Sequence, residues 1–432
     1  MENGRRPRIS LCMIVKNEEK KLERALSWGG GILWEKVVVD TGSTDGTVAL
    51  AERLGAKVCH FGWIDDFAAA RNFALEQAEG DWIITQDADE WPTPETLEKL
   101  LSVVEQAKER GLDGVFGGIL ELNDRGEITT CSSRIRVFRS TPDIRYRRRV
   151  HEQLEFTDGR PMRLADAEEE LIFFHDGYAG GQSAGKRRSG RNLRLLEQEL
   201  AEHPGDYEVM GYLGDEYGSF GDEERAIRWY RKSVEHMPET LREGDPRSAW
   251  TFSALIALYG ERGNYSEAEG IYRMAVEKQP CEADYDYQMG CLCTQGERWE
   301  DGVRYLAGGL AKLERHGTAN SCMKLKASLE TAYGNLALCF LRSGRRKEAV
   351  ETSVALLRVK PLDMKALYIL LSAFREDGGA QAESAPYVDG VVGFLGKLYV
   401  LSDLKNRLFI ARAAREAGWK AMENRMEKES GI

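Results

Sequence analysis

The sequence lacks any apolar run of about 18 residues, the length that an α-helix needs to cross a bilayer. Its first residues, MENGRRPRIS, lack the apolar segment and small-residue cleavage site of a secretory signal. The eight cysteines are scattered, with no CxxC pair and no zinc-finger spacing. We therefore expect a cytoplasmic protein with reduced thiols and no membrane span.

The chain also lacks an excess of positive charge. It has 60 Lys and Arg against 71 Asp and Glu, a net charge of −11, whereas nucleic-acid binding needs a basic surface. We expect no nucleic acid as a partner. One basic run, RYRRR at 145–149, is an exception. Its guanidinium groups suit an anion such as a sugar diphosphate, although such a run is more often a solvated strand face.

A chain of 432 residues is too long for one ordinary hydrophobic core, so two or three domains are expected. The first part alternates apolar, strand-like runs with helical patterns. Strands are predicted at 8–15, 37–40 and 56–61, and helices at 46–54 and 67–78. This alternation predicts an α/β fold with a mainly parallel sheet, whose ligands bind at the carboxyl ends of the strands.

Beyond about residue 200 the pattern becomes helical and repeats. Three segments match the tetratricopeptide pattern without gaps, with small residues where paired helices approach and Pro after the second helix. The matching residues are Leu213, Gly214, Tyr217, Gly221, Ala226, Tyr230, Ser233 and Pro238, then Leu255, Ile256, Tyr259, Gly263, Ala268, Tyr272, Ala275 and Pro280, then Leu336, Ala337, Phe340, Gly344, Ala349, Ser353, Leu356 and Pro361. Two degenerate units are expected at 283–316 and 364–397, followed by a capping helix near 403–429.

An Asp-x-Asp motif, Asp87-Ala88-Asp89, follows the apolar run WIIT. At the end of a strand it places two carboxylates in the ligand crevice, where hard oxygen donors suit Mg²⁺ or Mn²⁺. The alternative is a polar turn that caps a helix, because Pro92 and Pro94 follow directly.

A second motif, VVVDTGSTDGT over residues 37–47, lies upstream at the end of another predicted strand. Together the two motifs resemble a family-2 glycosyltransferase of the GT-A (Rossmann-like) fold, over about residues 8–178. The resemblance implies that Asp40 contacts the nucleotide base and that the turn shapes its pocket, which makes Thr41, Ser43 and Asp45 donor-binding residues. Ser43, Thr44 and Asp45 are equally ordinary capping residues.

The resemblance also implies roles for residues outside these turns. Arg71 and Asn72, in the segment DFAAARN, would help close the nucleotide pocket around the donor, a UDP-sugar. With Asp87, Ala88 and Asp89 they complete the predicted donor site. A later His completes the metal shell in such enzymes, which makes His175 the third expected metal ligand beside Asp87 and Asp89.

Inverting sugar transfer needs a general base on the acceptor side. In GT-A enzymes a carboxylate after the metal motif serves as this base. By its order along the chain, Glu152 is the corresponding residue here. Many members of the family carry the base in an acidic pair, whereas Glu152 follows a His. His151 and Asp176 therefore stay open as alternatives.

These assignments divide the chain into a GT-A domain at 1–180, a linker and connecting helix at 181–203, about five tetratricopeptide-like repeats at 204–400 and a capping helix at 401–432. The Gly-rich stretch 180–190 is not a phosphate loop, since Arg187 follows Lys186. We expect it to be a flexible linker that orders over the bound donor as a lid.

The predicted function is an inverting, metal-dependent transfer of a sugar from a nucleotide sugar to a peptide or protein acceptor held by the repeats. Repeat arrays present concave surfaces suited to extended peptides, and the fused arrangement resembles sublancin-type peptide glycosyltransferases. It also resembles core-lipopolysaccharide sugar transferases, so an envelope saccharide acceptor is one alternative. The other alternative is a non-catalytic scaffold with a sugar-nucleotide-sensing domain. A homodimer also stays open.

Overall fold

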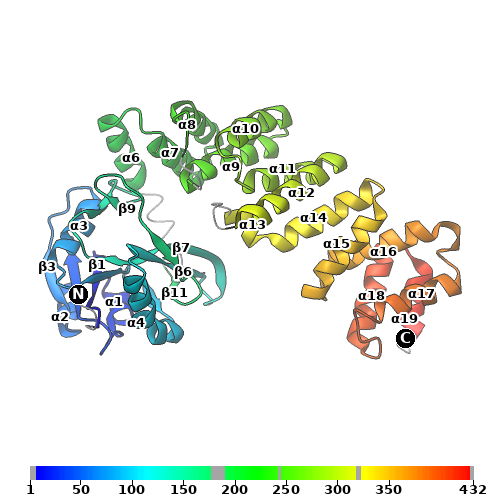
Figure 1. Cartoon of the computed structure of the whole chain (residues 1–432), viewed down its shortest axis with the longest axis horizontal. Coiled ribbons are helices and arrows are strands. Elements are labelled where there is room, and N and C mark those ends of the chain that lie inside the picture. The colour runs from blue at the N-terminus through cyan, green and yellow to red at the C-terminus, as the bar shows by residue number, and fades with distance from the viewer. Residues whose placement is uncertain (1–5, 177–189, 242–244, 318–322, 429–432) are drawn as a thin grey trace. The chain divides into compact units, whose positions relative to one another are not determined.

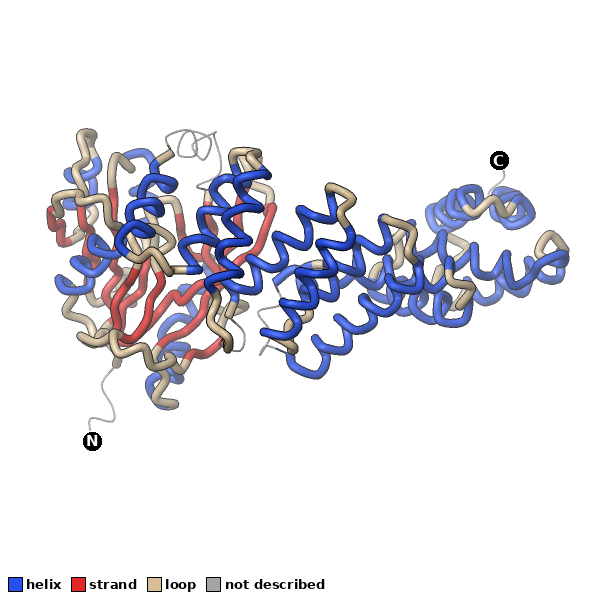
Figure 2. The backbone as a smooth tube through the Cα atoms, turned by 90° about the horizontal axis from the view of Figure 1, so that it is seen from above, coloured by secondary structure: helices blue, strands red, loops and turns tan. Residues whose placement is uncertain are grey.

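The computed structural model describes residues 6–176, 190–241, 245–317 and 323–428. The chain forms two compact units, Met1–Pro204 and Gly205–Ile432. All strands of the described residues belong to the first unit, and the described part of the second is helical (Figure 2). The predicted combination of an α/β domain with a helical array is confirmed.

A nine-stranded sheet forms the centre of the first unit, in the order β3-β2-β1-β4-β7-β6-β11-β5, with β10 beside β6 (Figure 1). Its strands are β1 Ile9–Val15, β2 Glu35–Asp40, β3 Lys57–His60, β4 Trp82–Thr85, β5 Glu90–Pro92, β6 Gly114–Leu122, β7 Ile128–Arg139, β10 Leu164–Asp166 and β11 Ile172–His175. Only β7 and β5 run antiparallel to their neighbours. Strands β8 Ile144–Arg147 and β9 Gln153–Phe156 form a separate pair.

Both faces of the parallel strands are covered, which explains why they read as continuous apolar runs. Along β1, Leu11 and Met13 pack into a core with helices α1 (Glu19–Leu26) and α4 (Pro94–Glu109). Cys12, between them, packs on the opposite face with helix α3 (Phe67–Gln77). The short helix α2 (Thr47–Arg53) follows β2.

Helix α6 (Arg191–Glu202) belongs to the first unit rather than to the repeats. Glu199 on this helix accepts the N–H of Arg149 at 3.0 Å and pairs with Arg148 at 3.3 Å. The connecting helix is thus anchored to the segment that precedes β9. The predicted lid lies largely in residues 177–189, which are outside the described residues.

The second unit is built from antiparallel helix pairs, as the tetratricopeptide pattern predicts. Its helices are α7 Tyr207–Ser219, α8 Glu223–His236, α9 Pro246–Glu261, α10 Tyr265–Lys278, α11 Asp284–Gln295, α12 Trp299–His316, α13 Met323–Ala327, α14 Leu329–Arg342, α15 Arg346–Val359, α16 Met364–Gly378, α17 Ala385–Leu395, α18 Leu404–Glu416 and α19 Lys420–Lys428. A methyl group at Gly214 would lie 2.5 Å from the Tyr230 ring, so the glycine makes room for this ring between α7 and α8.

The prediction of one capping helix near 403–429 is wrong. Two helices, α18 and α19, stand there, because Gly418 adopts a positive φ of 66° and ends the first of them. The following Trp419 is fully buried and donates its ring N–H to the carbonyl of Ala382 at 2.9 Å. Among the described residues, no helix has the length and apolarity needed to cross a membrane.

Candidate active site

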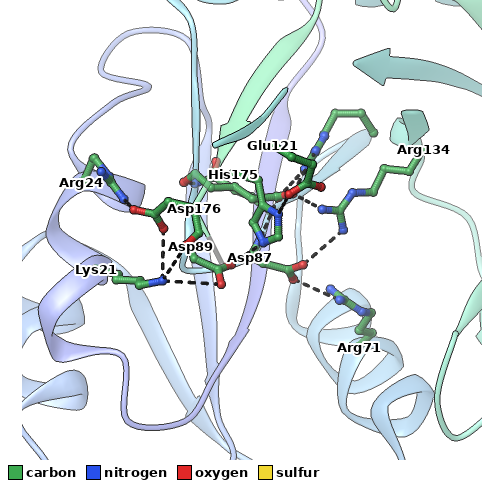
Figure 3. Close-up of polar contacts among 12 residues, drawn as sticks. Lys21, Arg24, Arg71, Asp87, Asp89, Glu121, Arg134, His175 and Asp176 are labelled. Atoms are coloured by element: carbon green, nitrogen blue, oxygen red, sulfur yellow. Dashed lines mark hydrogen bonds and ion pairs between the residues drawn. The ribbon is translucent and has the colours of Figure 1, made fainter. Parts of the chain in front are cut away.

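The predicted site residues gather where the parallel strands end. Asp40 is the last residue of β2, Asp87 and Asp89 follow β4, and His175 is the last residue of β11. Figure 3 shows Asp87 facing Arg71 and Arg134, while Asp89 faces His175 and Lys21. The carboxyl edge of the sheet therefore carries a dense network of charged groups.

Asp40 is a buried carboxylate held by its own turn. It accepts the N–H of Ser43 at 3.0 Å, and its Oδ2 lies 3.4 Å from Nδ1 of His60. Burial raises the pKa of Asp40, but the hydrogen bonds from Ser43 and His60 outweigh this and hold it below its ordinary value. Thr41 beside it donates its hydroxyl to the carbonyl of Val15 at 3.0 Å, which fixes β2 to β1.

The rest of the turn is bonded to the loop that follows β1. The Ser43 hydroxyl accepts the N–H of Asn17 at 2.9 Å, and Thr44 donates its N–H to the side chain of Asn17 at 2.7 Å. Asp45 accepts the N–H of Thr47 at 3.0 Å at the start of α2. Ser43 and Thr44 are thus bonded within the turn and to the loop after β1, while Asp45 alone of the three is bonded to the first residue of α2.

Asp87 is held by two guanidinium groups. Arg71 on α3 donates to its Oδ1 at 3.0 Å, and Arg134 on β7 donates to its Oδ2 at 3.2 Å. Burial alone would raise the pKa of Asp87, but the two cations hold it well below its ordinary value. The Nε of Arg71 also donates to Glu152 at 2.5 Å, so one guanidinium bridges the Asp-x-Asp motif and the predicted base.

Glu90, three residues after Asp87, is fully buried and organises the end of β4. It accepts from Arg136 at 2.7 Å, from Arg134, and from the N–H of Asp87 at 3.0 Å. A buried carboxylate is tolerated only when it is paired in this way. Glu90, Arg134 and Arg136 were not among the predicted site residues, although two arginines that alternate with Ile135 and Val137 are a signal of buried ion pairs.

Asp89 and His175 face each other, with Oδ1 and Nε2 3.4 Å apart. The other ring nitrogen of His175 lies 2.6 Å from Glu121 on β6, which orients the imidazole. Burial lowers the pKa of His175, but the hydrogen bonds with Asp89 and Glu121 outweigh it and raise the pKa to about 9. Lys21 on α1 lies 3.9 Å from the second oxygen of Asp89.

The side chains around Asp87 and Asp89 suit a divalent cation only in part. No group of three or more His, Cys, Asp and Glu side chains among the described residues has the geometry of a metal site. Asp89 and His175 fit as a pair of ligands, because a carboxylate oxygen and an imidazole nitrogen that can both bind a metal lie 3.4 Å apart. Asp87 fits less well, since both of its oxygens are bonded to arginines.

The alternatives for the base have different surroundings. Asp176 is paired with Arg24 and lies 3.1 Å from Lys21, so two cations of α1 hold it. His151 has a positive φ of 56°, at a turn before β9. Glu152 is bonded to Arg71, which places it next to the Asp-x-Asp motif.

Asn72 clamps the backbone of β8. Its amide donates to the carbonyl of Tyr146 at 2.8 Å and accepts the N–H of Tyr146 at 2.8 Å, as a neighbouring strand would. Asn72→Ala should therefore destabilise the protein by roughly 2–4 kcal/mol, because two backbone groups lose their partners. Urea unfolding measures this, with Glu76→Ala on the exposed side of α3 as the control. Unchanged stability with weakened nucleotide binding would instead support the predicted contact.

The pKa of His175 makes stability depend on pH. Its value of about 9 in the fold exceeds the ordinary 6.5, so the protonated form is stabilised by folding. This contribution is complete below about pH 6.5 and is lost as the pH rises through about 9, with a maximum of roughly 3 kcal/mol. Unfolding of wild-type and His175→Gln proteins in a chelating buffer should show a stability difference that shrinks over this interval. Parallel pH profiles would contradict the prediction.

The arginines of the basic run at 145–149 form hydrogen bonds and ion pairs within the protein. Arg145 donates to the carbonyls of Thr141 and Ile144, and Arg147 pairs with Glu155 at 2.8 Å. Arg148 pairs with Glu199 of α6, and Arg149 pairs with Glu202 of the same helix at 2.6 Å. Trp91 likewise packs between the guanidinium of Arg24 and the ring of Phe174. The contacts of the basic run favour a structural role for these arginines over contact with a bound anion.

Residues 10–172 match the sequence profile of glycosyl transferase family 2. A TPR repeat-containing protein of Synechococcus elongatus is 33% identical over 62% of this chain and 66% of its own length. The prophage-derived glycosyltransferase SunS of Bacillus subtilis is 26% identical over 66% of this chain and 67% of its own. An uncharacterized glycosyltransferase of Rickettsia felis is 43% identical over 19% of this chain and 29% of its own. The alignments to the first two thus span about two thirds of each relative, and the predicted resemblance to family 2 is confirmed.

Proposed function

From a chain whose residues 10–172 form a family-2 glycosyltransferase domain, we infer an inverting, metal-dependent enzyme that moves a sugar from a UDP-sugar to a polypeptide side chain. The observation that carries this proposal is the convergence of Asp40, Asp87, Asp89 and His175 at one edge of the sheet. Among the relatives, SunS is named a glycosyltransferase, and this supports the class of reaction.

Each part of the donor would have its own partner. Asp40 is ionised and fixed by its turn, and it would accept hydrogen bonds from the uracil ring of the nucleotide. Arg71 and Arg134 both donate to Asp87, and their guanidinium groups would donate to the phosphate oxygens when the donor binds. Asp89 and His175 would hold Mg²⁺ or Mn²⁺, which when bound offsets the charge that develops on the departing diphosphate.

Glu152 would act as the general base. The acceptor oxygen or sulfur attacks the anomeric carbon, and its proton passes to the Glu152 carboxylate. The bond from that carbon to the diphosphate oxygen breaks, and UDP leaves with the electron pair. Attack opposite the leaving group inverts the anomeric centre. The guanidinium of Arg71 donates to Glu152 and holds this carboxylate beside the Asp-x-Asp motif.

The acceptor proposed is a Ser, Thr or Cys side chain of a peptide or protein. Tetratricopeptide-like helix pairs support this choice, because such repeats present surfaces that bind extended peptides.

The test is release of UDP from UDP-glucose, UDP-galactose and UDP-N-acetylglucosamine with Mn²⁺ or Mg²⁺, and without either ion. We expect turnover of at least one donor that a chelator abolishes and Mn²⁺ restores. Absence of turnover with every donor and both ions would favour a scaffold instead of an enzyme. Turnover that persists in excess chelator would refute the metal dependence alone.

A further inference from the structure

One side of strand β7 is open next to the Asp-x-Asp motif. Strand β4 pairs with β7 only along Trp82–Ile84, opposite Arg139–Val137. After Thr85 the chain leaves this position and forms β5, which pairs with β11 on the other side of the sheet. Within the described ranges, no strand continues beside β7 from Ile128 to Ile135 on the β4 side. We call this open edge the β7 lane.

Hydrogen bonding in β6 shows which groups face the lane. Gly118 of β6 donates its N–H to the carbonyl of Leu171 at 2.8 Å, so its backbone groups point toward β11 and away from β7. Ser133 lies opposite Gly118. In an antiparallel ladder such a pair exchanges no hydrogen bonds, so the N–H and C=O of Ser133 point into the lane. The alternation gives Cys131 the same orientation.

The lane has few of the features that usually protect the edge of a sheet, and its register shift against β6 lies at Thr129, before Cys131 and Ser133. Residues 128–133, ITTCSS, contain no charge and no proline, and Ile128, Thr130, Cys131 and Ser133 are exposed. Natural edge strands are usually blocked by charges, bulges or prolines, because unpaired backbone groups pair with any extended chain. From Thr130 to Ser133, β-branched and small polar residues without charge or proline are suited to receive another strand.

The lane also ends at the donor site. Arg134, the next residue after Ser133, donates to Asp87 at 3.2 Å, and Thr130 lies opposite Glu121, the partner of His175. A chain in the lane would continue the line of β4 and meet the Asp-x-Asp turn at its end. A side chain on that strand would therefore lie close to the residues proposed to hold the diphosphate and the metal.

We propose that an extended segment of the acceptor polypeptide binds in the β7 lane and adds a strand to the sheet through Cys131 and Ser133. The inference rests on the proposed function, because it assigns a binding mode to the proposed acceptor. Main-chain hydrogen bonds supply affinity that depends little on sequence, and alternate side chains of the added strand supply the choice of target. A saccharide acceptor has no backbone ladder to match these groups. The other strand that fits is β7 of a second copy.

The experiment compares Ser133→Pro with Ser133→Ala. Proline removes the N–H that faces the lane, and it is tolerated on an edge strand because that N–H has no partner in the sheet. Alanine removes the hydroxyl and keeps the N–H. The probe is a pool of synthetic ten-residue peptides with Ser, Thr or Cys at the centre. We expect kcat/KM for glycosylation of the peptides to fall about tenfold or more in Ser133→Pro and less than about twofold in Ser133→Ala, with peptide-independent donor hydrolysis unchanged in both.

Several outcomes would overturn the inference. Equal peptide kcat/KM in Ser133→Pro and wild type refutes the lane as the binding site, and a dimer that dissociates in Ser133→Pro alone assigns the lane to a second copy. Loss of donor hydrolysis together with peptide transfer refutes a selective role in acceptor binding. If wild type hydrolyses the donor but glycosylates no peptide of the pool, the polypeptide acceptor and the lane fail together. If wild type hydrolyses no donor, the proposed function itself fails first.

Discussion

An Asp89→Asn enzyme should lose sugar transfer by about a thousandfold or more while keeping its fold. Asp89 faces His175 and Lys21, and its carboxylate is the best-placed protein oxygen for a divalent cation. The amide keeps the shape of the side chain but removes the charge, so the cation is held weakly and the departing diphosphate is not neutralised. A loss of several kcal/mol of transition-state stabilisation corresponds to this factor. Release of UDP at saturating Mn²⁺ measures it.

The matched control is Asp158→Asn, the same change in an exposed carboxylate that pairs with Arg160. Activity of the control should stay within about twofold of wild type, since exposed ion pairs contribute little. Circular dichroism and thermal unfolding verify that both variants are folded. Activity of Asp89→Asn close to that of wild type would refute the metal assignment, with Asp87 the next residue to test.

Glu152→Gln should lower the rate of transfer by about 10²- to 10⁴-fold, the usual contribution of a general base. Glutamine retains a hydrogen-bond acceptor for Arg71, so the guanidinium should still reach Asp87. Binding of UDP, measured by calorimetry, should therefore change by less than about threefold. A selective loss of rate with unchanged binding is the signature of a group that acts only in the chemical step.

The alternatives for the base are tested by Asp176→Asn and His151→Gln in the same assays. Asp176 is paired with Lys21 and Arg24, so we expect its substitution to perturb the position of α1 more than the proton transfer. If Asp176→Asn or His151→Gln shows the larger selective loss of rate, the base is that residue and not Glu152.

The sequence revealed those parts of the site that follow a local pattern. An apolar run that ends in Asp40 or in Asp87-Ala88-Asp89 marks a strand and its ligand edge at once, and the repeat spacing marks the helix pairs. Both depend on residues that are close in the chain. The structure places these motifs at the strand ends where the pattern predicted them.

The missed parts depend on long-range pairing. Arg134 contacts Asp87 across 47 positions and Glu121 contacts His175 across 54, and no local periodicity records such distances. The antiparallel β6–β7 hairpin that delivers Arg134 and Glu121 interrupts the alternation of strands and helices. The error at the C-terminus has another cause, because Gly418 lies inside a helical pattern and only its φ shows that it ends a helix.

The bridging guanidinium of Arg71 has a consequence for the order in which the substrates bind. While Arg71 spans Asp87 and Glu152, a nucleophile that approaches Glu152 meets a carboxylate already engaged by a cation. A diphosphate competes for that cation and would release Glu152 for the acceptor. The reaction would then follow a compulsory sequence, with the nucleotide sugar entering first and UDP leaving last. Until the acceptor arrives, the released carboxylate would face water alone, which would account for release of UDP in the absence of a peptide.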